Sequence, residues 1–311
     1  REWKYLEPVR AFCELHGIPV QMGNEKIPSF WRLRETRTFI DWLRQRESRV
    51  VDGAALAGWV EGCPSGPWYD LLRQAVEEHA LETGGNDVPV DHLIEWLAEW
   101  GREIRRRQRE LLLVTAHGAK GLEFDHVAVL DGGWDRVERD EDADAPRRLY
   151  YVAMTRARQT LALARLDGPH PMLDPLVDHA SVVERAPVEL AAPSPALLFR
   201  HVRASLGDVD LGFAGRLADR HTTHRAIAAL SPGDPLETRI TDYGSWELLD
   251  PAGSVVGRLA KSFRPPREMR CRSAEVSAIV GWSRESSEPQ YRDSIKCESW
   301  EVVVPELVFE I

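Results

Sequence analysis

The chain has 311 residues, of which 43% are hydrophobic and 29% are charged, as is typical of a soluble globular protein. The net charge of -10 argues against a sequence-independent DNA coat protein, which is usually basic. It does not exclude a protein that contacts DNA through one local face. No apolar run approaches the roughly 18 residues of a membrane span, and no signal peptide is recognisable, so we expect no membrane association.

The four cysteines lie far apart in the sequence, and no CxxC pair occurs. Zinc ribbons and disulfide scaffolds are therefore not expected. We predict unpaired structural thiols, no metal site and a reducing, cytoplasmic location. The chain begins with Arg1 rather than Met, so we expect it to be cut from a longer protein.

Helical patterns dominate the first third of the chain. Hydrophobic spacing predicts a helix and then a strand within residues 1–20. Residues 28–107 contain four tryptophan-rich amphipathic patterns, separated by breaks that contain Gly and Pro. Packing between helices explains the tryptophans most simply, and base stacking by one of them is the alternative. The arginines of residues 102–109 form either a solvated helix face or a phosphate-contacting face.

Strand and helix patterns alternate over residues 111–166. We predict strands at Leu111–Thr115, Val127–Leu130 and Thr160–Ala164. A helix is predicted at Leu149–Arg158. Short apolar strands that alternate with helices favour a parallel sheet.

The last part of the chain changes character. Residues 171–195 lie in a stretch rich in Pro, Asp and Ala, which predicts a linker, and residues 196–230 show helical spacing. Residues 235–311 contain short apolar strands with turn signals between them, which favours a small β-rich domain, with a barrel as one option. The arginines between Arg258 and Arg272 suggest either a nucleic-acid contact or a solvated loop.

Two stretches carry the functional argument. The first begins at Leu112 and runs LLVTAHGAKGLEFDHVAVL, and the second begins at Pro146 and runs PRRLYYVAMTRARQTLAL. Together and in this order they closely resemble motifs V and VI of UvrD/Rep-like superfamily 1 DNA helicases. Arg1, followed by a predicted helix and Gly17-Ile18-Pro19, resembles the end of motif IV in the same family.

The resemblance implies an α/β fold. We expect a RecA-like domain of the P-loop-NTPase type, with a parallel sheet, made of residues 1–27 and 108–170. Residues 28–107 would be a small helical insertion in it. Residues 171–195 would link it to an accessory helical and β-rich domain at residues 196–311.

The resemblance also assigns residues to an ATP site. Arg156 matches the family's arginine finger, which fits the need for positive charge where the γ-phosphate becomes more negative, because a guanidinium is planar, bidentate and always protonated. Glu123 matches the acid of the ribose network, Lys120 is expected to order the loop, and Gly121 permits a tight turn. Arg1 matches a second γ-phosphate arginine. The alternative for Arg156 is an ion pair on the helix surface.

Thr115 and His117 match family residues that face the backbone of single-stranded DNA. Without the motif, His117 would be interpreted as a hydrogen-bonded packing residue. We expect Tyr150 and Tyr151 in the core rather than stacked on bases.

Other features depart from the family. No GxxxxGK[ST] P-loop occurs, so ATP and Mg²⁺ would bind only together with a missing N-terminal Walker A domain. A degenerate, non-catalytic remnant is the alternative. Ala145 and Pro146 stand where an acidic pair usually precedes motif VI, and the helical insertion is much smaller than in well-known members.

These observations predict the C-terminal motor half of an ATP-dependent DNA helicase or translocase of DNA repair or recombination, inactive as an isolated fragment. Its expected partners are single-stranded or partly duplex DNA and an upstream Walker A domain of the same protein. The alternatives are a non-catalytic nucleic-acid-binding module and a protein-interaction module. An accessible Arg156 would favour the motor, whereas a buried Arg156 paired with an internal carboxylate would favour the others.

Overall fold

The computed structural model describes residues 3–16, 18, 20–23, 28–103, 111–137, 141–165, 169–176, 179, 181–183, 185, 199–266 and 268–310. The chain divides into two units, one made of residues 1–25 and 108–200 and the other of residues 26–107 and 201–311. None of the helices in these described ranges is long and apolar enough to cross a membrane.

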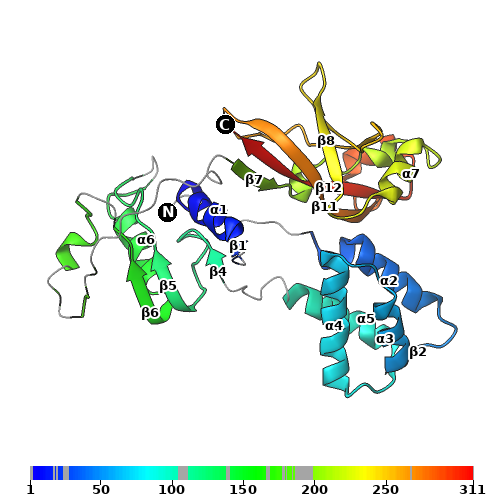
Figure 1. The fold of residues 1–311 in the computed structure, drawn as a ribbon, viewed down its shortest axis with the longest axis horizontal. Helices are drawn as coiled ribbons and strands as arrows, with labels where there is room; N and C mark the ends of the chain where they lie inside the picture. Colours follow the sequence, from blue (N-terminus) through cyan, green and yellow to red (C-terminus); the bar gives the residue numbers. More distant parts are fainter. Residues whose placement is uncertain are drawn as a thin grey trace. The chain divides into compact units, whose positions relative to one another are not determined.

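The first unit is a small α/β assembly (Figure 1). Its elements are η1 (Trp3–Tyr5), α1 (Glu7–Leu15), β1 (Val20–Met22), β4 (Leu111–Leu113), β5 (Phe124–Val129), α6 (Ala145–Met154), β6 (Ala157–Leu163) and η3 (Asp174–Leu176). Strand β1 pairs in parallel with β4, and β5 pairs in parallel with β6. The sequence predicts one parallel sheet, but the described strands form two separate parallel pairs. The chain between β4 and β5 forms hydrogen-bonded turns instead of extending the ladder.

Helix α6 ends earlier than the sequence predicts. The helical pattern extends to Arg158, but α6 stops at Met154 and β6 begins at Ala157. The amide of Thr155 still donates to the Tyr151 carbonyl at 3.0 Å. The carbonyl of Arg156 then accepts from the Phe124 amide at 2.8 Å, which commits the chain to pairing with β5. This tertiary contact outweighs the local helical spacing.

The four predicted helical patterns of the second unit are confirmed. The elements are η2 (Phe30–Arg32), α2 (Arg34–Gln45), β2 (Val50–Val51), α3 (Gly53–Glu61), α4 (Pro67–Thr83), β3 (Val88–Pro89) and α5 (Val90–Glu103). Local signals set the boundaries: the Asp52 carboxylate accepts from the Ala55 amide at 2.6 Å and caps α3. Pro67 opens α4, and Gly84, with a φ of 65°, ends it.

The rest of the second unit is built on a six-stranded sheet (Figure 1). Its elements are β7 (Phe199–Arg203), η5 (Leu206–Asp208), η6 (Ala214–Arg216), α7 (Thr222–Ala229), β8 (Pro235–Ile240), β9 (Trp246–Leu249), β10 (Val255–Arg258), β11 (Arg270–Ser283), η7 (Pro289–Ser294) and β12 (Ser299–Glu310). The strand order is β10-β9-β8-β11-β12-β7, and β11 pairs with β12 in antiparallel fashion along their length. Within residues 199–230 the helical prediction is met by α7 and by the short 3-10 helices η5 and η6, but not at β7, which joins the sheet beside β12.

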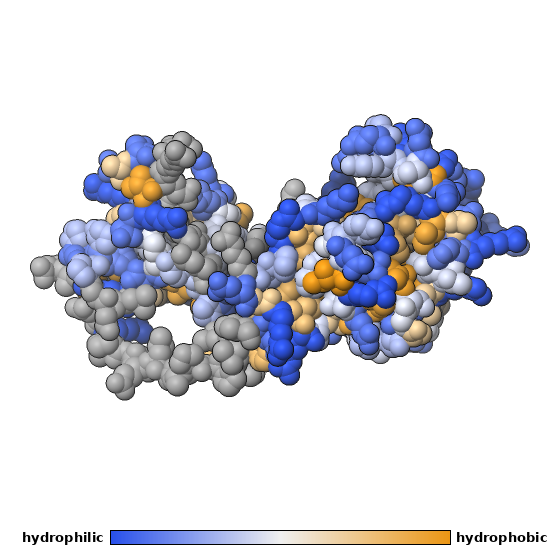
Figure 2. Space-filling view, turned by 90° about the horizontal axis from the view of Figure 1, so that it is seen from above, coloured by the Kyte–Doolittle hydropathy of each residue, from blue (hydrophilic) through white to orange (hydrophobic). Residues whose placement is uncertain are grey.

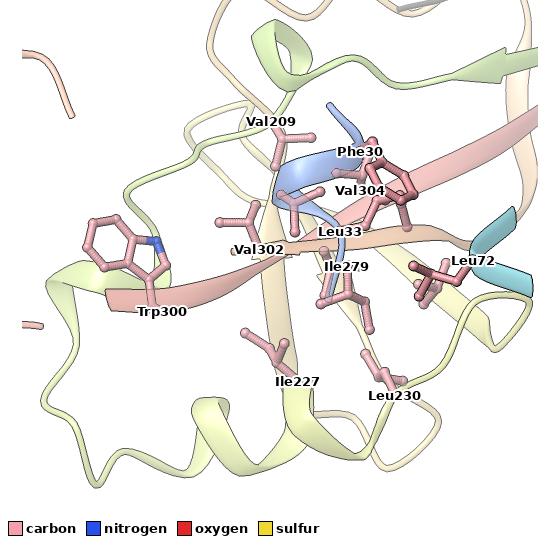
Figure 3. Close-up of a cluster of buried hydrophobic side chains, with 14 of the residues drawn as sticks. Phe30, Leu33, Leu72, Val209, Ile227, Leu230, Ile279, Trp300, Val302 and Val304 are labelled. Atoms are coloured by element: carbon pink, nitrogen blue, oxygen red, sulfur yellow. The ribbon is translucent and has the colours of Figure 1, made fainter. Parts of the chain in front are cut away.

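The helical segment and the sheet share one hydrophobic core. Phe30, Leu33 and Leu72 belong to the same buried cluster as Ile279 and Val304, and Figure 3 shows them around β11 and β12. The sequence suggests two separate domains here. A helix layer and a sheet each have one apolar face, and packing these faces together removes both from water. Figure 2 shows this unit at the right, with hydrophilic residues around its rim and hydrophobic residues nearer its middle.

Backbone contacts strengthen this junction. Leu33 forms an isolated antiparallel bridge with Val280 of β11. The indole nitrogen of Trp68 donates to the carbonyl of Ser277 at 2.9 Å. The helical segment is therefore fixed to the sheet by polar contacts as well as by apolar packing.

Candidate functional site

The first motif forms a compact turn directly after β4. The carbonyl of Thr115 accepts from the Ala119 amide at 2.9 Å, and its hydroxyl oxygen accepts from the Gly118 amide at 3.2 Å. The Leu122 amide donates to the Ala119 carbonyl at 3.0 Å, and Gly121 has a φ of 82°, which favours glycine. Thr115 thus shapes the turn, and Gly121 has the conformational role that the sequence predicts.

The polar side chains of this turn point to solvent. His117 and Lys120 are exposed, and neither side chain has a hydrogen-bond or ion-pair partner among the described residues. A basic side chain that is not bound within the protein can contact an anionic ligand without first breaking an internal bond. The turn therefore presents one imidazole and one ammonium group to whatever binds here.

Arg156 connects the second motif to this turn. Its Nε donates to the Val152 carbonyl at 3.0 Å, its Nη1 to the Leu122 carbonyl at 3.0 Å and its Nη2 to the Thr155 hydroxyl at 3.1 Å. The side chain is half-exposed, and it has no carboxylate partner among the described residues. All three acceptors are neutral, and a guanidinium has five N–H donors. Two donors are thus left for a ligand, and within the described part of the chain Arg156 does not form the surface ion pair considered as the alternative.

Glu123 is paired with an arginine that the sequence reasoning did not single out. Its Oε2 accepts from Arg158 Nε at 3.1 Å, across the parallel β5–β6 pair. The side chains of Arg158 and Glu123 are 61% and 56% exposed, and an exposed pair of this kind contributes only about 0–1 kcal/mol. Glu123 can therefore exchange Arg158 for another hydrogen-bond donor at low cost. The signal that was missed is the second arginine of the Arg156-Ala157-Arg158 run.

The two adjacent tyrosines of α6 have opposite environments. Tyr150 is 3% exposed and packs edge-on against Trp134, with ring centroids 4.7 Å apart, which confirms its core position. Tyr151 is 66% exposed, so the prediction that it lies in the core is wrong. Successive helical residues point about 100° apart, and only one face of α6 packs on the core.

His170, Asp131 and Tyr150 form a cluster of polar residues that contacts α6 through Tyr150. His170 is 2% exposed, and its Nδ1 accepts from the amides of Met172 at 3.2 Å and Leu173 at 3.1 Å. Its Nε2 therefore carries the proton, and it lies 3.3 Å from Asp131 Oδ1. The Tyr150 ring lies 5.5 Å from the His170 ring, and burial followed by the Asp131 charge raises the pKa of Tyr150 to about 12. The tyrosine thus stays neutral and holds α6 through its ring.

A family comparison covers both motifs. Residues 92–167 match the model of the UvrD-like helicase C-terminal domain. The match includes the turn after β4 and the whole α6–β6 segment, so the resemblance seen in motifs V and VI is confirmed there. No curated protein and no solved structure matches the chain.

Arg1, the remaining residue expected at this UvrD-like site, lies outside the described residues. The described residues contain no group of three or more His, Cys, Asp or Glu that could hold a metal ion. The site is cationic and hydrogen-bond-donating, which suits phosphate oxygens rather than Mg²⁺.

All four cysteines are free, and Cys63, Cys271 and Cys297 belong to the second unit, which does not contain the two motifs. Cys297 lines a cavity of about 290 Å³ in the second unit, donates to the Leu217 carbonyl at 3.2 Å and lies 3.7 Å from His224 Nε2. Burial, followed by Asp219, raises the pKa of Cys297 to about 11. The thiol is therefore protonated at neutral pH and is a weak nucleophile.

Proposed function

We propose that the chain is the C-terminal motor half of an ATP-dependent DNA helicase or translocase that acts in DNA repair or recombination. The observation that carries the proposal is Arg156, which lies where the two helicase motifs meet. It is half-exposed, is bound only to neutral acceptors and retains two unused donors. A structural arginine would be expected to have a carboxylate partner, whereas a phosphate-binding arginine must be able to leave its resting contacts.

The resting contacts of Arg156 are weak enough to exchange for a phosphate. In a hydrogen bond from the guanidinium to a carbonyl only the donor is charged, whereas a bond to a phosphate oxygen joins two charged groups and adds their attraction. Binding of a γ-phosphate would thus displace the Leu122 carbonyl from Arg156. This exchange would also release the turn that contains His117 and Lys120, which links nucleotide state to the proposed DNA-facing residues.

ATP and Mg²⁺ would be held mainly by a Walker A domain of the same protein. ATP supplies the phosphoryl group that is transferred to water, and Mg²⁺ neutralises charge on its phosphates. In this proposal Lys120 and Gly121 order the turn beside the nucleotide. Glu123 exchanges Arg158 for the ribose hydroxyls, and Arg1 is a second γ-phosphate contact.

The DNA side of the proposal rests on the same turn. Thr115 and His117 would contact the backbone of single-stranded or partly duplex DNA. His117 is exposed and unpartnered among the described residues, as such a contact requires. Opening and closing of the nucleotide cleft would then move the turn along the strand. A cytoplasmic location is proposed on the same basis as the unpaired cysteines, which a reducing compartment preserves.

The decisive test is ATP hydrolysis by the protein that carries both motor halves, with single-stranded DNA present. We expect Arg156→Ala to lower kcat by about 10³–10⁵-fold while nucleotide binding is largely kept. Arg225→Ala is the control, because Arg225 is an exposed α7 residue without a partner among the described residues. Unchanged hydrolysis in Arg156→Ala would refute the motor assignment.

A further inference from the structure

Two arginines meet where the helical segment joins the sheet of the second unit. The Cζ of Arg32 lies 3.9 Å from the centroid of the Trp282 ring, so the guanidinium stacks on the indole. The guanidinium of Arg37 lies over Gly281, where any Cβ would overlap it. Both arginines are half-buried, one at the end of η2 and the other in the first turn of α2. They therefore approach the same end of β11.

Neither arginine is neutralised by the described part of the chain. Among the described residues, the guanidinium groups of Arg32 and Arg37 form no hydrogen bond or ion pair, and the contact of Arg32 with Trp282 is a stacking contact. Asp41 lies one turn further along α2, at the spacing that often forms an ion pair, yet it forms none with Arg37. Arg34, between them in sequence, binds both oxygens of Glu301. Arg34 thus takes up this carboxylate, whereas Arg32 and Arg37 have no ion pair among the described residues.

The fold holds these two like charges together, although burial and mutual repulsion both disfavour their charged forms. Burial, followed by the charge of Arg37, lowers the pKa of Arg32. The Leu33–Val280 bridge fixes the backbone between them against β11. Gly281 supplies the space that Arg37 occupies. Two adjacent cations that have no ion-pair partner among the described residues, and that are placed by a helix and a strand, form a site suited to an anion.

We propose that Arg32 and Arg37 form an anion-binding site for a phosphate group, and that its source is the backbone of a nucleic acid. Two planar guanidinium groups present several donors that match phosphate oxygens bidentately. Trp282 contacts the face of the Arg32 guanidinium, so the stacking does not use its N–H donors. The site uses none of the motif residues and lies in the other unit, so it does not rest on the proposed ATP motor.

The test is oligonucleotide binding by the 311-residue chain. Fluorescence anisotropy with a labelled single-stranded DNA would be measured over a range of salt concentrations, for the wild type and for a double variant with Arg32→Gln and Arg37→Gln. We expect affinity to fall about tenfold or more and the slope of log K against log salt to decrease by about 1. Arg44→Gln is the matched control, because Arg44 is an exposed α2 residue without a partner among the described residues.

A second experiment separates the two sources of phosphate. Inorganic phosphate is titrated while thermal unfolding is followed, and we expect it to stabilise the wild type but not the double variant. Loss of this stabilisation with unchanged DNA affinity would overturn the nucleic acid as the source and leave free phosphate as the ligand. If neither readout differs between the double variant and Arg44→Gln, the anion site itself is refuted. Thermal unfolding in the absence of phosphate reports whether the variants are folded.

Discussion

Arg34 is the residue whose removal should separate the helical segment from the sheet most directly. Its Nε and Nη2 donate to the two carboxylate oxygens of Glu301 at 2.6 and 2.7 Å. Its Nη1 donates to the Leu230 carbonyl at 2.6 Å, and Nη2 also donates to the Ile227 carbonyl at 2.8 Å. One side chain of α2 thus joins β12 and the last turn of α7.

The loss of stability expected for Arg34→Ala follows from these contacts and their burial. The side chains of Arg34 and Glu301 are 20% and 31% exposed. Breaking a fully buried pair by removing one partner costs about 3–5 kcal/mol, whereas an exposed pair contributes about 0–1 kcal/mol. The intermediate exposure, together with two bonds to carbonyls at a helix C-terminus, predicts a loss of about 2–4 kcal/mol for Arg34→Ala. In a unit of this size each kcal/mol lowers Tm by about 2–4 °C.

Tryptophan fluorescence during urea unfolding would measure the effect, since every tryptophan except Trp3 and Trp134 belongs to the second unit. A double-mutant cycle with Glu301→Ala should give a coupling of about 1–3 kcal/mol. Arg44→Ala is the control and should change the free energy of unfolding by less than about 0.5 kcal/mol. A loss below about 1 kcal/mol for Arg34→Ala, without measurable coupling, would refute the view that this contact holds the two parts together.

Three further predictions concern buried polar groups. Burial raises the pKa of Glu35, so at neutral pH its carboxylate destabilises the folded state, and this penalty is relieved as pH falls. Glu35→Gln should therefore raise the free energy of unfolding at pH 7 by on the order of 1 kcal/mol, measured by urea unfolding, and an equal gain near pH 4 would contradict this cause. Burial lowers the pKa of His79, and both ring nitrogens lack hydrogen-bond partners among the described residues. The neutral His79 side chain therefore contributes fully to stability above about pH 6.5, and this contribution is lost as pH falls below that value. Melting curves at pH 7.5 and 5.5 should show a smaller acid loss for His79→Leu than for the wild type, and parallel losses would rule this out. Tyr150→Phe should change the stability of the first unit by less than about 1 kcal/mol, because the hydroxyl has no hydrogen-bond partner among the described residues. Tyr150→Ala should cost about 3–5 kcal/mol, because it removes the ring that packs on Trp134. Native-state hydrogen exchange of the α6 amides would measure both, and equal costs would show that the hydroxyl matters.

Much of the local structure was predictable because its signals are local. Asp52, Pro67 and Gly84 mark helix boundaries by their own capping and backbone preferences, and the four helical patterns appear as α2 to α5. The strands of the C-terminal region followed from short apolar runs between turn residues. The end of α6 was not predictable in this way, because the Arg156 carbonyl pairs with Phe124 from a distant strand.

The candidate site was predictable in composition but not in geometry. The two motifs identify Thr115, His117, Lys120 and Glu123 by residue type and order alone. The folded chain decides which of them is engaged: Glu123 pairs with Arg158 of β6, and the Thr115 hydroxyl accepts from the Gly118 amide of its own turn. The ion pair joins Arg158 of β6 to Glu123, the residue that precedes β5, so it cannot be read from either motif separately.

The sequence by itself determined the two helicase motifs, the absence of a P-loop and the positions of most helices and strands, because these depend on residue identity and short-range spacing. Only the tertiary structure decided that the helical segment and the C-terminal sheet share one core, and that Arg156 rests on neutral acceptors. It also decided that Arg32 and Arg37 come together without a carboxylate. The physical reason is the same in each case: packing and electrostatic pairing depend on distances between residues that are far apart in the chain.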